Sequence, residues 1–265
     1  MKDLLSYTIQ TAKGAGRILM QHFGRIEHVK HKDIDSIVTE ADIRAEKYIR
    51  RRIAEVCPDH RVLGEEQGLD PVKAEYTWVV DPLDGTSNFA AGLPLFAVSI
   101  ALFRKKQPVL AVVYDPVLRH SYWASEEMDG ARKDGDPIRV SERDLTPTTL
   151  AVFGSSWNHP DLVHIPTRII TRYKGRNLGS AVLQLISIAS GQVEFAISDN
   201  VRLWDVAAAG FILVKAGGKL TDLSGKNLFP LKLSFEEYST QSLCVIASTS
   251  HVHRKVMREI VLKNP

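Results

Sequence analysis

Apolar residues recur with helical spacing in two N-terminal segments of the chain. Residues 3–23 carry them near the 3.6-residue period and stop at Gly24, and a second such segment runs from Thr39 to Pro58. This spacing places apolar side chains on one face of a helix, and Gly or Pro then ends it. We therefore expect two helices, separated over residues 25–36 by a polar surface loop or ribbon.

After Pro58 the pattern changes to short apolar runs that are typical of β-strands. A run of consecutive strands behind two helices indicates an α+β arrangement. The expected strands are residues 60–63, 76–80, 96–103, 109–114, 121–124 and 138–140.

Polar residues 141–149 form a candidate junction, beyond which strands and helices alternate. We therefore predict an N-terminal α+β half (1–145) that carries most of the candidate metal ligands, and a C-terminal α/β half (146–265). The expected strands there are 150–153, 193–197, 219–223 and 243–247, and the expected helices are 160–173, 179–190, 204–216 and 251–262.

Composition describes an ordinary globular chain of 265 residues, with 44% hydrophobic and 25% charged residues. The net charge of +3 is too small to indicate nucleic-acid binding by itself. Cys57 and Cys244 match no metal or redox spacing, which favours free thiols in a reducing compartment. No signal-peptide pattern and no run of roughly 18–20 apolar residues is present, so we expect a cytoplasmic protein that does not enter membranes.

Residues 76–90 are where we expect the chemistry. Residues 76–80 are aromatic and β-branched, which predicts a buried strand that Asp81 and the turn-forming Pro82 would end. Because Asp84 follows three residues later, such a turn can bring both carboxylates to one point. The residues after Gly85 can open a short helix whose free N–H groups face that point. Carboxylates beside backbone donors suit a site that Mg²⁺ and a phosphate share.

Each signal also has a purely structural interpretation. An Asp-Pro-x-Asp-Gly segment is common turn chemistry, and Thr39 with Asp42 is typical of a capping-box helix start. Asp205 falls in a first helical turn, where a carboxylate complements the helix dipole. Glu65 and the glutamate after it could simply lie in a surface loop. The combination of these segments along the chain indicates a site, whereas none of them does so alone.

Taken together, four segments resemble the inositol monophosphatase family of Mg²⁺-dependent, lithium-sensitive phosphatases, and the resemblance spans nearly the whole chain. It implies a layered αβαβα sandwich of the sugar-phosphatase type, a homodimer, and hydrolysis of a small phosphorylated metabolite. The segments are Thr39–Asp42, Gly64–Glu66, Asp81–Thr86 and Trp204–Gly210.

The resemblance also implies a role for each matching residue. Thr86 would hold the attacking water, Asp42 would orient the Thr86 hydroxyl, and backbone N–H groups of Gly85 and Thr86 would bind the phosphate. Two metal ions about 3.5–4 Å apart would neutralise the phosphate. A third Mg²⁺ would bind near Glu65, beside a mobile loop at Lys30–Lys32, and Mn²⁺ is an alternative metal. The implied metal ligands are Glu65, Asp81, the Leu83 carbonyl, Asp84 and Asp205.

Substrate identity is left open by the sequence. Ser180 and Ala181 match a substrate-contacting segment of the family, but Ser198 stands where members usually carry a glutamate, with Asp199 next to it. Fructose-1,6-bisphosphate, histidinol phosphate and 3′-phosphoadenosine 5′-phosphate therefore stay alternatives to inositol phosphate.

A hypothesis of another class is a regulatory binding protein of the transcription or RNA-processing machinery, as some bacterial members of the family are. Mixed charges along the chain favour ordinary solvated faces over such a binding surface. The candidate surface residues would be Arg50–Arg52, Arg168, Arg172, Lys174 and Arg176.

Overall fold

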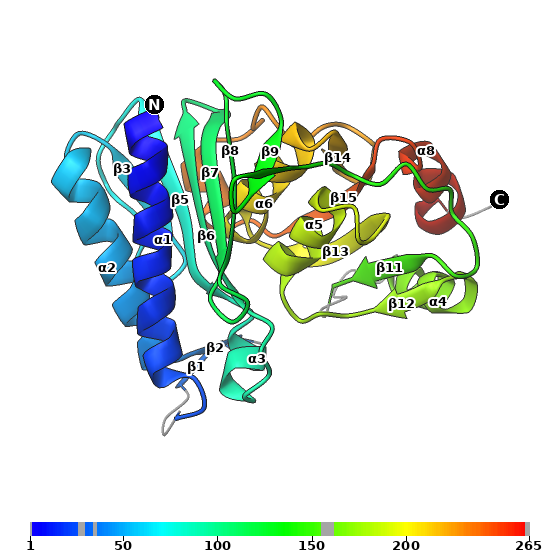
Figure 1. Cartoon of the computed structure of the whole chain (residues 1–265), viewed down its shortest axis with the longest axis horizontal. Coiled ribbons are helices and arrows are strands. Elements are labelled where there is room, and N and C mark those ends of the chain that lie inside the picture. Colours follow the sequence, from blue (N-terminus) through cyan, green and yellow to red (C-terminus); the bar gives the residue numbers. More distant parts are fainter. Residues whose placement is uncertain (1, 26–29, 34–35, 155–161, 263–265) are drawn as a thin grey trace.

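The chain, a computed structural model, folds into alternating layers of helices and sheets (Figure 1). The structure describes residues 2–25, 30–33, 36–154 and 162–262. Its helices are α1 (Lys2–His22), α2 (Glu40–Val56), α3 (Thr86–Ala90), α4 (His164–Arg172), α5 (Ala181–Ala189), α6 (Leu203–Lys215), α7 (Phe235–Tyr238), α8 (His253–Val256) and the π-helix η2 (Met257–Val261).

The N-terminal strands form a small ribbon and a large mixed sheet. The large sheet has the order β10-β9-β8-β7-β6-β5-β3-β4 and is antiparallel except between β3 and β5. The strands are β1 (Lys30–Asp33), β2 (Ser36–Val38), β3 (Arg61–Gly64), β4 (Gly68–Leu69), β5 (Tyr76–Asp84), β6 (Ala97–Arg104), β7 (Gln107–Asp115), β8 (His120–Ser125), β9 (Ala131–Lys133) and β10 (Asp136–Ile138).

The C-terminal strands form a second, five-stranded mixed sheet of order β12-β11-β13-β15-β14. In Figure 1, α5 and α6 lie between the two sheets, α1 and α2 cover the outer face of the large sheet, and α4 and α8 lie beyond the small one. This is the layered αβαβα sandwich, and it confirms the expected fold class. The strands are β11 (Leu150–Phe153), β12 (Lys174–Arg176), β13 (Phe195–Val201), β14 (Gly218–Thr221) and β15 (Leu243–Thr249).

Strand β6 shows how the layers are held together. Val98, Ile100 and Leu102 point into the core under α1 and α2, whereas Ala97 and Ala101 point into the core around α5 and α6. Side chains alternate between faces of a strand, so a strand covered on both faces is apolar throughout. The core around α5 and α6 contains residues from both sides of the expected junction at 145/146. The division into two halves stays a prediction.

Most expected elements are confirmed, and the differences are local. Of the segment expected as a loop or ribbon, Lys30–Asp33 pairs with Ser36–Val38 as the β1–β2 ribbon. The helix expected over 251–262 is a short α-helix followed by η2. The short elements β4, β9, β12 and α7 were not expected, because segments of two to four residues are too short to show a period. The start of the helix expected over 160–173 lies outside the described residues.

Candidate functional site

Strand β5 carries two candidate ligands across an irregularity in its pairing. Asp81 lies opposite Ser99 of β6 and Asp84 lies opposite Ala97, so β5 contains one residue more than its partner. This is a β-bulge, a feature that re-aims side chains. The expected tight turn at Pro82 is therefore wrong, because the strand continues through the bulge to Asp84. The Asp81 carboxylate accepts a hydrogen bond from the Leu83 N–H at 2.9 Å, which fixes the local geometry.

Helix α6 brings a third carboxylate to the same point. Asp205 lies in its first turn, where its Oδ2 accepts the backbone N–H of Arg202 at 2.7 Å. One carboxylate oxygen from each of Asp81, Asp84 and Asp205 lies within 4.8 Å of the other two. We call these three residues the acidic cluster. Residues separated by more than a hundred positions thus meet where the bulge of β5 faces the start of α6.

The electrostatics of the cluster fit a cation site. Burial raises the pKa of Asp81 well above its ordinary value, and the nearby charges of Glu65, Asp84 and Asp205 raise it further. Burial also raises the pKa of Asp84 to about 7, although hydrogen bonds oppose the shift. Like charges held together away from water favour either protons or a cation. Carboxylate oxygens are the donors that hard divalent cations prefer, so these residues fit a divalent metal ion.

The N-terminus of α5 fixes the orientation of Asp84. Its two carboxylate oxygens accept the backbone N–H groups of Ala181 and Val182, each at 3.1 Å. The Ser180 hydroxyl donates to the same carboxylate. Ser180 and Ala181 therefore both contact Asp84, and their expected contact with substrate stays a prediction. The sequence did not show this contact, because only the sandwich brings β5 beside α5.

Thr86 lies at the start of α3, between the acidic cluster and α2. Its hydroxyl donates to Asp42 Oδ1 at 3.2 Å and to the Leu83 carbonyl at 3.0 Å, so the three residues form one contact group. Gly85, directly before it, has φ +94° and faces the Leu95 carbonyl so closely that a Cβ would lie 2.7 Å from that oxygen. Only glycine adopts this conformation at low cost.

Glu65 follows β3 in the loop that leads to β4. Its backbone N–H donates to the Val80 carbonyl at 3.2 Å, which ties the loop to β5. The negative charge of Glu65 raises the pKa of both Asp81 and Asp84, so its charge acts on the cluster, although Glu65 is not one of the three residues whose oxygens lie within 4.8 Å of one another. The fully buried Glu46 of α2 accepts hydrogen bonds from this loop, and sequence reasoning missed it. Its spacing, four residues after Asp42, puts it on the same helix face, but this spacing alone does not distinguish a buried glutamate from an exposed one.

Ser198 and Asp199 lie on β13, and both side chains are buried. The Ser198 hydroxyl donates to Gln184 Oε1 of α5 at 3.4 Å. A Cβ at Gly154 would lie 3.3 Å from the Ser198 Cβ, so Ser198 is packed between β11 and α5. The expected role of these two residues in substrate binding stays a prediction.

Two of the basic residues expected to form a binding surface, Arg50 and Arg168, are engaged within the chain, whereas Arg51, Arg172, Lys174 and Arg176 are exposed. The interpretation of Arg50–Arg52 as one solvated helix face is wrong for Arg50, whose side chain is 14% exposed and pairs with Glu46 and Asp70. Arg168 donates to the carbonyls of Ile260 and Leu262. These contacts join elements of the fold, and they leave Arg51 as the most exposed of Arg50–Arg52.

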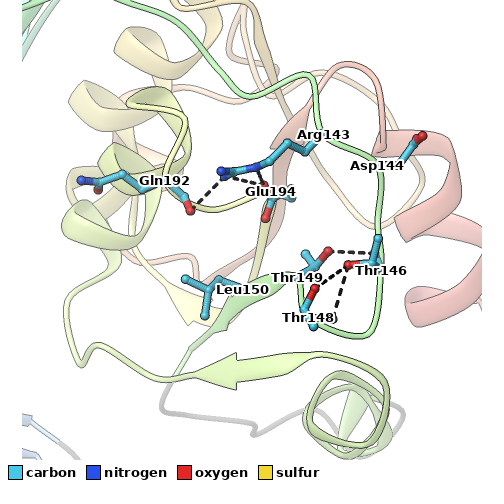
Figure 2. Close-up of a pocket in the computed structure, with 8 residues that line it drawn as sticks. All are labelled: Arg143, Asp144, Thr146, Thr148, Thr149, Leu150, Gln192 and Glu194. Atoms are coloured by element: carbon cyan, nitrogen blue, oxygen red, sulfur yellow. Dashed lines mark hydrogen bonds and ion pairs between the residues drawn. The ribbon is translucent and has the colours of Figure 1, made fainter.

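A cavity of about 510 Å³ lies elsewhere, between the junction segment and the turn before β13 (Figure 2). Figure 2 shows Arg143 reaching Glu194 and the Gln192 carbonyl across it, so the guanidinium is already bonded. The cavity follows the C-terminal end of α5, whereas Asp84 contacts its N-terminal end, a helix of nine residues or about 13 Å away. The cavity and the acidic cluster are therefore separate.

Within the described part of the chain, no helix is both long and apolar enough to cross a bilayer. Residues 1–262 match the sequence model of the Inositol monophosphatase family. The "Fructose-1,6-bisphosphatase/inositol-1-monophosphatase" of Thermotoga maritima is 35% identical over 230 residues, which is 84% of this chain and 86% of that protein. The "Nus factor SuhB" of Xylella fastidiosa is 34% identical over 231 residues, or 84% and 83% of the two chains.

Solved structures share the fold as well. The extragenic suppressor protein SuhB from Bartonella henselae superposes with a TM-score of 0.88 at 30% identity, over 97% of this chain and 98% of that one.

Proposed function

The chain belongs to the inositol monophosphatase family, and on that premise we propose that it is a Mg²⁺-dependent phosphomonoesterase acting on a small phosphate ester. The observation that carries the proposal is the acidic cluster, in which carboxylates from β5 and α6 meet within 4.8 Å. Like charges held this close, two of them buried, favour a cation that joins them or a proton that neutralises one of them.

Five residues would hold the metal ions: Glu65, Asp81, Leu83 through its carbonyl, Asp84 and Asp205. When bound, Mg²⁺ neutralises the phosphate oxygens and lowers the pKa of a coordinated water. Asp84 presents its charge in a fixed direction, because the start of α5 donates to both of its oxygens. This fixed donor set reduces the reorganisation that metal binding would otherwise require.

Thr86 positions the attacking water. Its hydroxyl hydrogen is directed at Asp42 and the Leu83 carbonyl, so its lone pairs are left to accept a proton of that water. Asp42 thereby acts through Thr86 and sets the direction of the hydroxyl. Backbone N–H groups of Gly85 and Thr86 bind the phosphate beside the water.

The substrate is a small phosphorylated metabolite whose organic part faces Ser198 and Asp199. The Thermotoga relative is named for both fructose-1,6-bisphosphate and inositol 1-phosphate hydrolysis, which supports testing these two esters first. Histidinol phosphate and 3′-phosphoadenosine 5′-phosphate complete the panel. Homodimer formation, a cytoplasmic location and inhibition by Li⁺ belong to the same proposal.

The test is phosphate release from this panel with Mg²⁺, with EDTA, and by the Asp84→Asn variant. We expect release with Mg²⁺ and a loss of about 10³-fold or more in both other arms, since each tenfold in rate corresponds to about 1.4 kcal/mol of barrier. Asp115→Asn is the matched control, because Asp115 is also buried, has a raised pKa and caps backbone N–H groups at the end of β7. Full turnover in EDTA or in Asp84→Asn would overturn the proposal.

A second candidate function is a regulatory partner of the transcription machinery, and the similarity to Nus factor SuhB favours it. In that case the Asp84→Asn variant would keep its biological activity while losing phosphate release. The internal contacts of Arg50 and Arg168 take these two residues out of the basic surface that this alternative would use.

A further inference from the structure

Glu46 is a fully buried carboxylate on α2 that lies outside the acidic cluster. Its side chain has no exposed surface, and it accepts three hydrogen bonds on two oxygens. Two of them come from the backbone N–H groups of Glu66 at 2.7 Å and Gln67 at 3.0 Å. A buried charge is tolerated only where donors surround it, so this carboxylate and the loop after β3 hold each other in place.

Arg50, one helical turn further along α2, extends the same contact. Its guanidinium donates to Glu46 at 2.8 Å, to Asp70 at 2.7 Å and to the Gly68 carbonyl at 2.6 Å. Asp70 in turn accepts the Val62 N–H of β3 at 2.8 Å. The loop from Gly64 to Asp70 is therefore bound to α2 at both of its ends. We call Glu46, Arg50 and Asp70 the loop anchor.

Gly64 shows how closely the anchor approaches the loop. A Cβ at this position would lie 2.4 Å from Glu46 Oε1 and 2.5 Å from its Cδ. Glycine is thus required by the carboxylate of Glu46 rather than by an unusual backbone angle. Glu65 lies between Gly64 and Glu66, and both of these neighbours meet the same carboxylate.

We infer that Glu46 is a positioning residue, which fixes the Glu65 loop so that Glu65 completes the metal site beside the acidic cluster. The inference rests on the proposed function, because it assigns Glu65 to that site. In this arrangement one face of α2 supports the site through two residues. Asp42 contacts Thr86, and Glu46, four residues later, contacts the loop that carries Glu65.

The experiment measures Mn²⁺ binding by calorimetry for the wild type, Glu46→Gln and Glu65→Gln, in the full chain without substrate. In Glu46→Gln an amide NH₂ replaces one acceptor oxygen and meets a backbone or guanidinium donor. We expect its Kd for Mn²⁺ to rise by about 10-fold or more, the cost that loss of an outer hydrogen-bond partner has at metal sites. The Mg²⁺ concentration for half-maximal phosphate release should rise with it, while KM for the phosphate ester stays unchanged.

Glu194→Gln is the matched control. Glu194 is likewise buried and pairs with an arginine, Arg143, but it lies in the separate cavity of Figure 2. Its substitution should lower thermal stability and leave the Kd for Mn²⁺ at the wild-type value. A general loss of stability therefore cannot imitate the result expected for Glu46→Gln.

A double-mutant cycle tests whether Glu46 affects Mn²⁺ binding through Glu65 or independently of it. In the Glu65→Gln background, Glu46→Gln should weaken Mn²⁺ binding no further, since Glu46 acts through Glu65. Full additivity, or a Kd for Glu46→Gln within about twofold of wild type, would overturn the inference. Should Glu46→Gln not fold, Gly64→Ala provides the same test, because its Cβ forces the loop away from Glu46. A wild-type Kd in Gly64→Ala would equally contradict the inference.

Failure of the two proposals is distinguishable. If the wild type binds Mn²⁺ but releases no phosphate from any ester, the proposed function fails while the binding arms still decide the role of Glu46. If phosphate is released and Glu46→Gln binds Mn²⁺ normally, only the positioning role fails.

Discussion

Helices α2 and α6 begin in the same way, but their capping carboxylates have different surroundings. In α2, Asp42 accepts the backbone N–H of Thr39 at 2.9 Å, and in α6, Asp205 accepts that of Arg202 at 2.7 Å. Both are the third residue of their helix, and in each the carboxylate accepts the backbone N–H of the residue that precedes the helix, which is the half of a capping box that the N3 side chain supplies. Asp42 then faces hydroxyl groups of Thr39 and Thr86, whereas Asp205 faces two further carboxylates.

The difference shows that a capping contact stabilises a helix and also fixes where the capping carboxylate lies. One oxygen of each carboxylate is used by its own helix, which fixes the direction of the other. In α2 the other oxygen faces a hydrogen-bond donor, so hydrogen bonds stabilise the charge of the carboxylate. In α6 it meets like charges, so the cluster needs a cation or a proton.

The largest expected effect comes from Asp205→Asn. The amide oxygen can still accept the Arg202 N–H, so the start of α6 should survive, but the ligand charge is lost. We expect phosphate release to fall by about 10³-fold or more, because each 1.36 kcal/mol of lost transition-state stabilisation is tenfold in rate and a metal contributes several kcal/mol. Initial rates at saturating Mg²⁺ measure the effect.

Asp42→Asn makes the same substitution in the equivalent position of α2. It should leave the Kd for Mn²⁺ at the wild-type value, whereas Asp205→Asn should weaken Mn²⁺ binding. Equal Mn²⁺ affinities in the two variants would contradict the distinction between the two caps.

A smaller effect is expected from Thr86→Ala, which removes the group that Asp42 directs. Because the hydroxyl positions the water only as it reacts, kcat should fall roughly 10²-fold while KM stays nearly unchanged. Steady-state kinetics give both values. Thr86→Ser restores the hydroxyl and should recover most of the rate. A rise in KM with unchanged kcat would instead assign Thr86 to ground-state binding.

Sequence reasoning predicted the sandwich and the convergence on Asp81, Asp84 and Asp205, because periodicity and the family resemblance both carry information along the chain. It predicted the wrong local structure at Pro82, since a bulge and a turn demand similar residues and only the pairing of β5 with β6 distinguishes them. The contact of Thr86 with Asp42 was expected from the resemblance, and the structure places the two side chains 3.2 Å apart.

The supporting contacts could not be predicted, because they join elements whose spatial order is set by packing. Asp84 accepts N–H groups of α5 almost a hundred residues later, and local sequence gives no sign of that pairing. Glu46 resembles any charged residue on an amphipathic helix, yet it is fully buried. Its i,i+4 spacing from Arg50 is the same as that of an ordinary surface ion pair.

The smallest expected effect is on the pH dependence of stability. This dependence tests whether the carboxylates around the start of α6 are destabilised by their surroundings, as those around the start of α2 are not. The pKa of Asp84 is raised to about 7 in the folded chain, from an ordinary value of 3.8. The folded state therefore binds more protons than the unfolded state between these values, so stability falls as pH rises through them. Without metal, Tm should rise as pH is lowered from about 8 to about 6.5, by about 2–4 °C for each 1 kcal/mol regained.

Saturating Mg²⁺ should reverse this dependence of Tm on pH, so that Tm rises with pH. The metal binds the deprotonated carboxylates and therefore stabilises the folded state more at high pH. Burial lowers the pKa values of His60 and His253. These two histidines therefore make stability fall as pH is lowered, but mainly below about pH 6.5. Scanning calorimetry of the metal-free wild type against Asp84→Asn isolates the cluster, since the variant cannot take up that proton. Identical slopes in the two proteins would mean that the buried surroundings of Asp84 do not hold a proton on it, and the distinction between the two caps would lose its electrostatic basis.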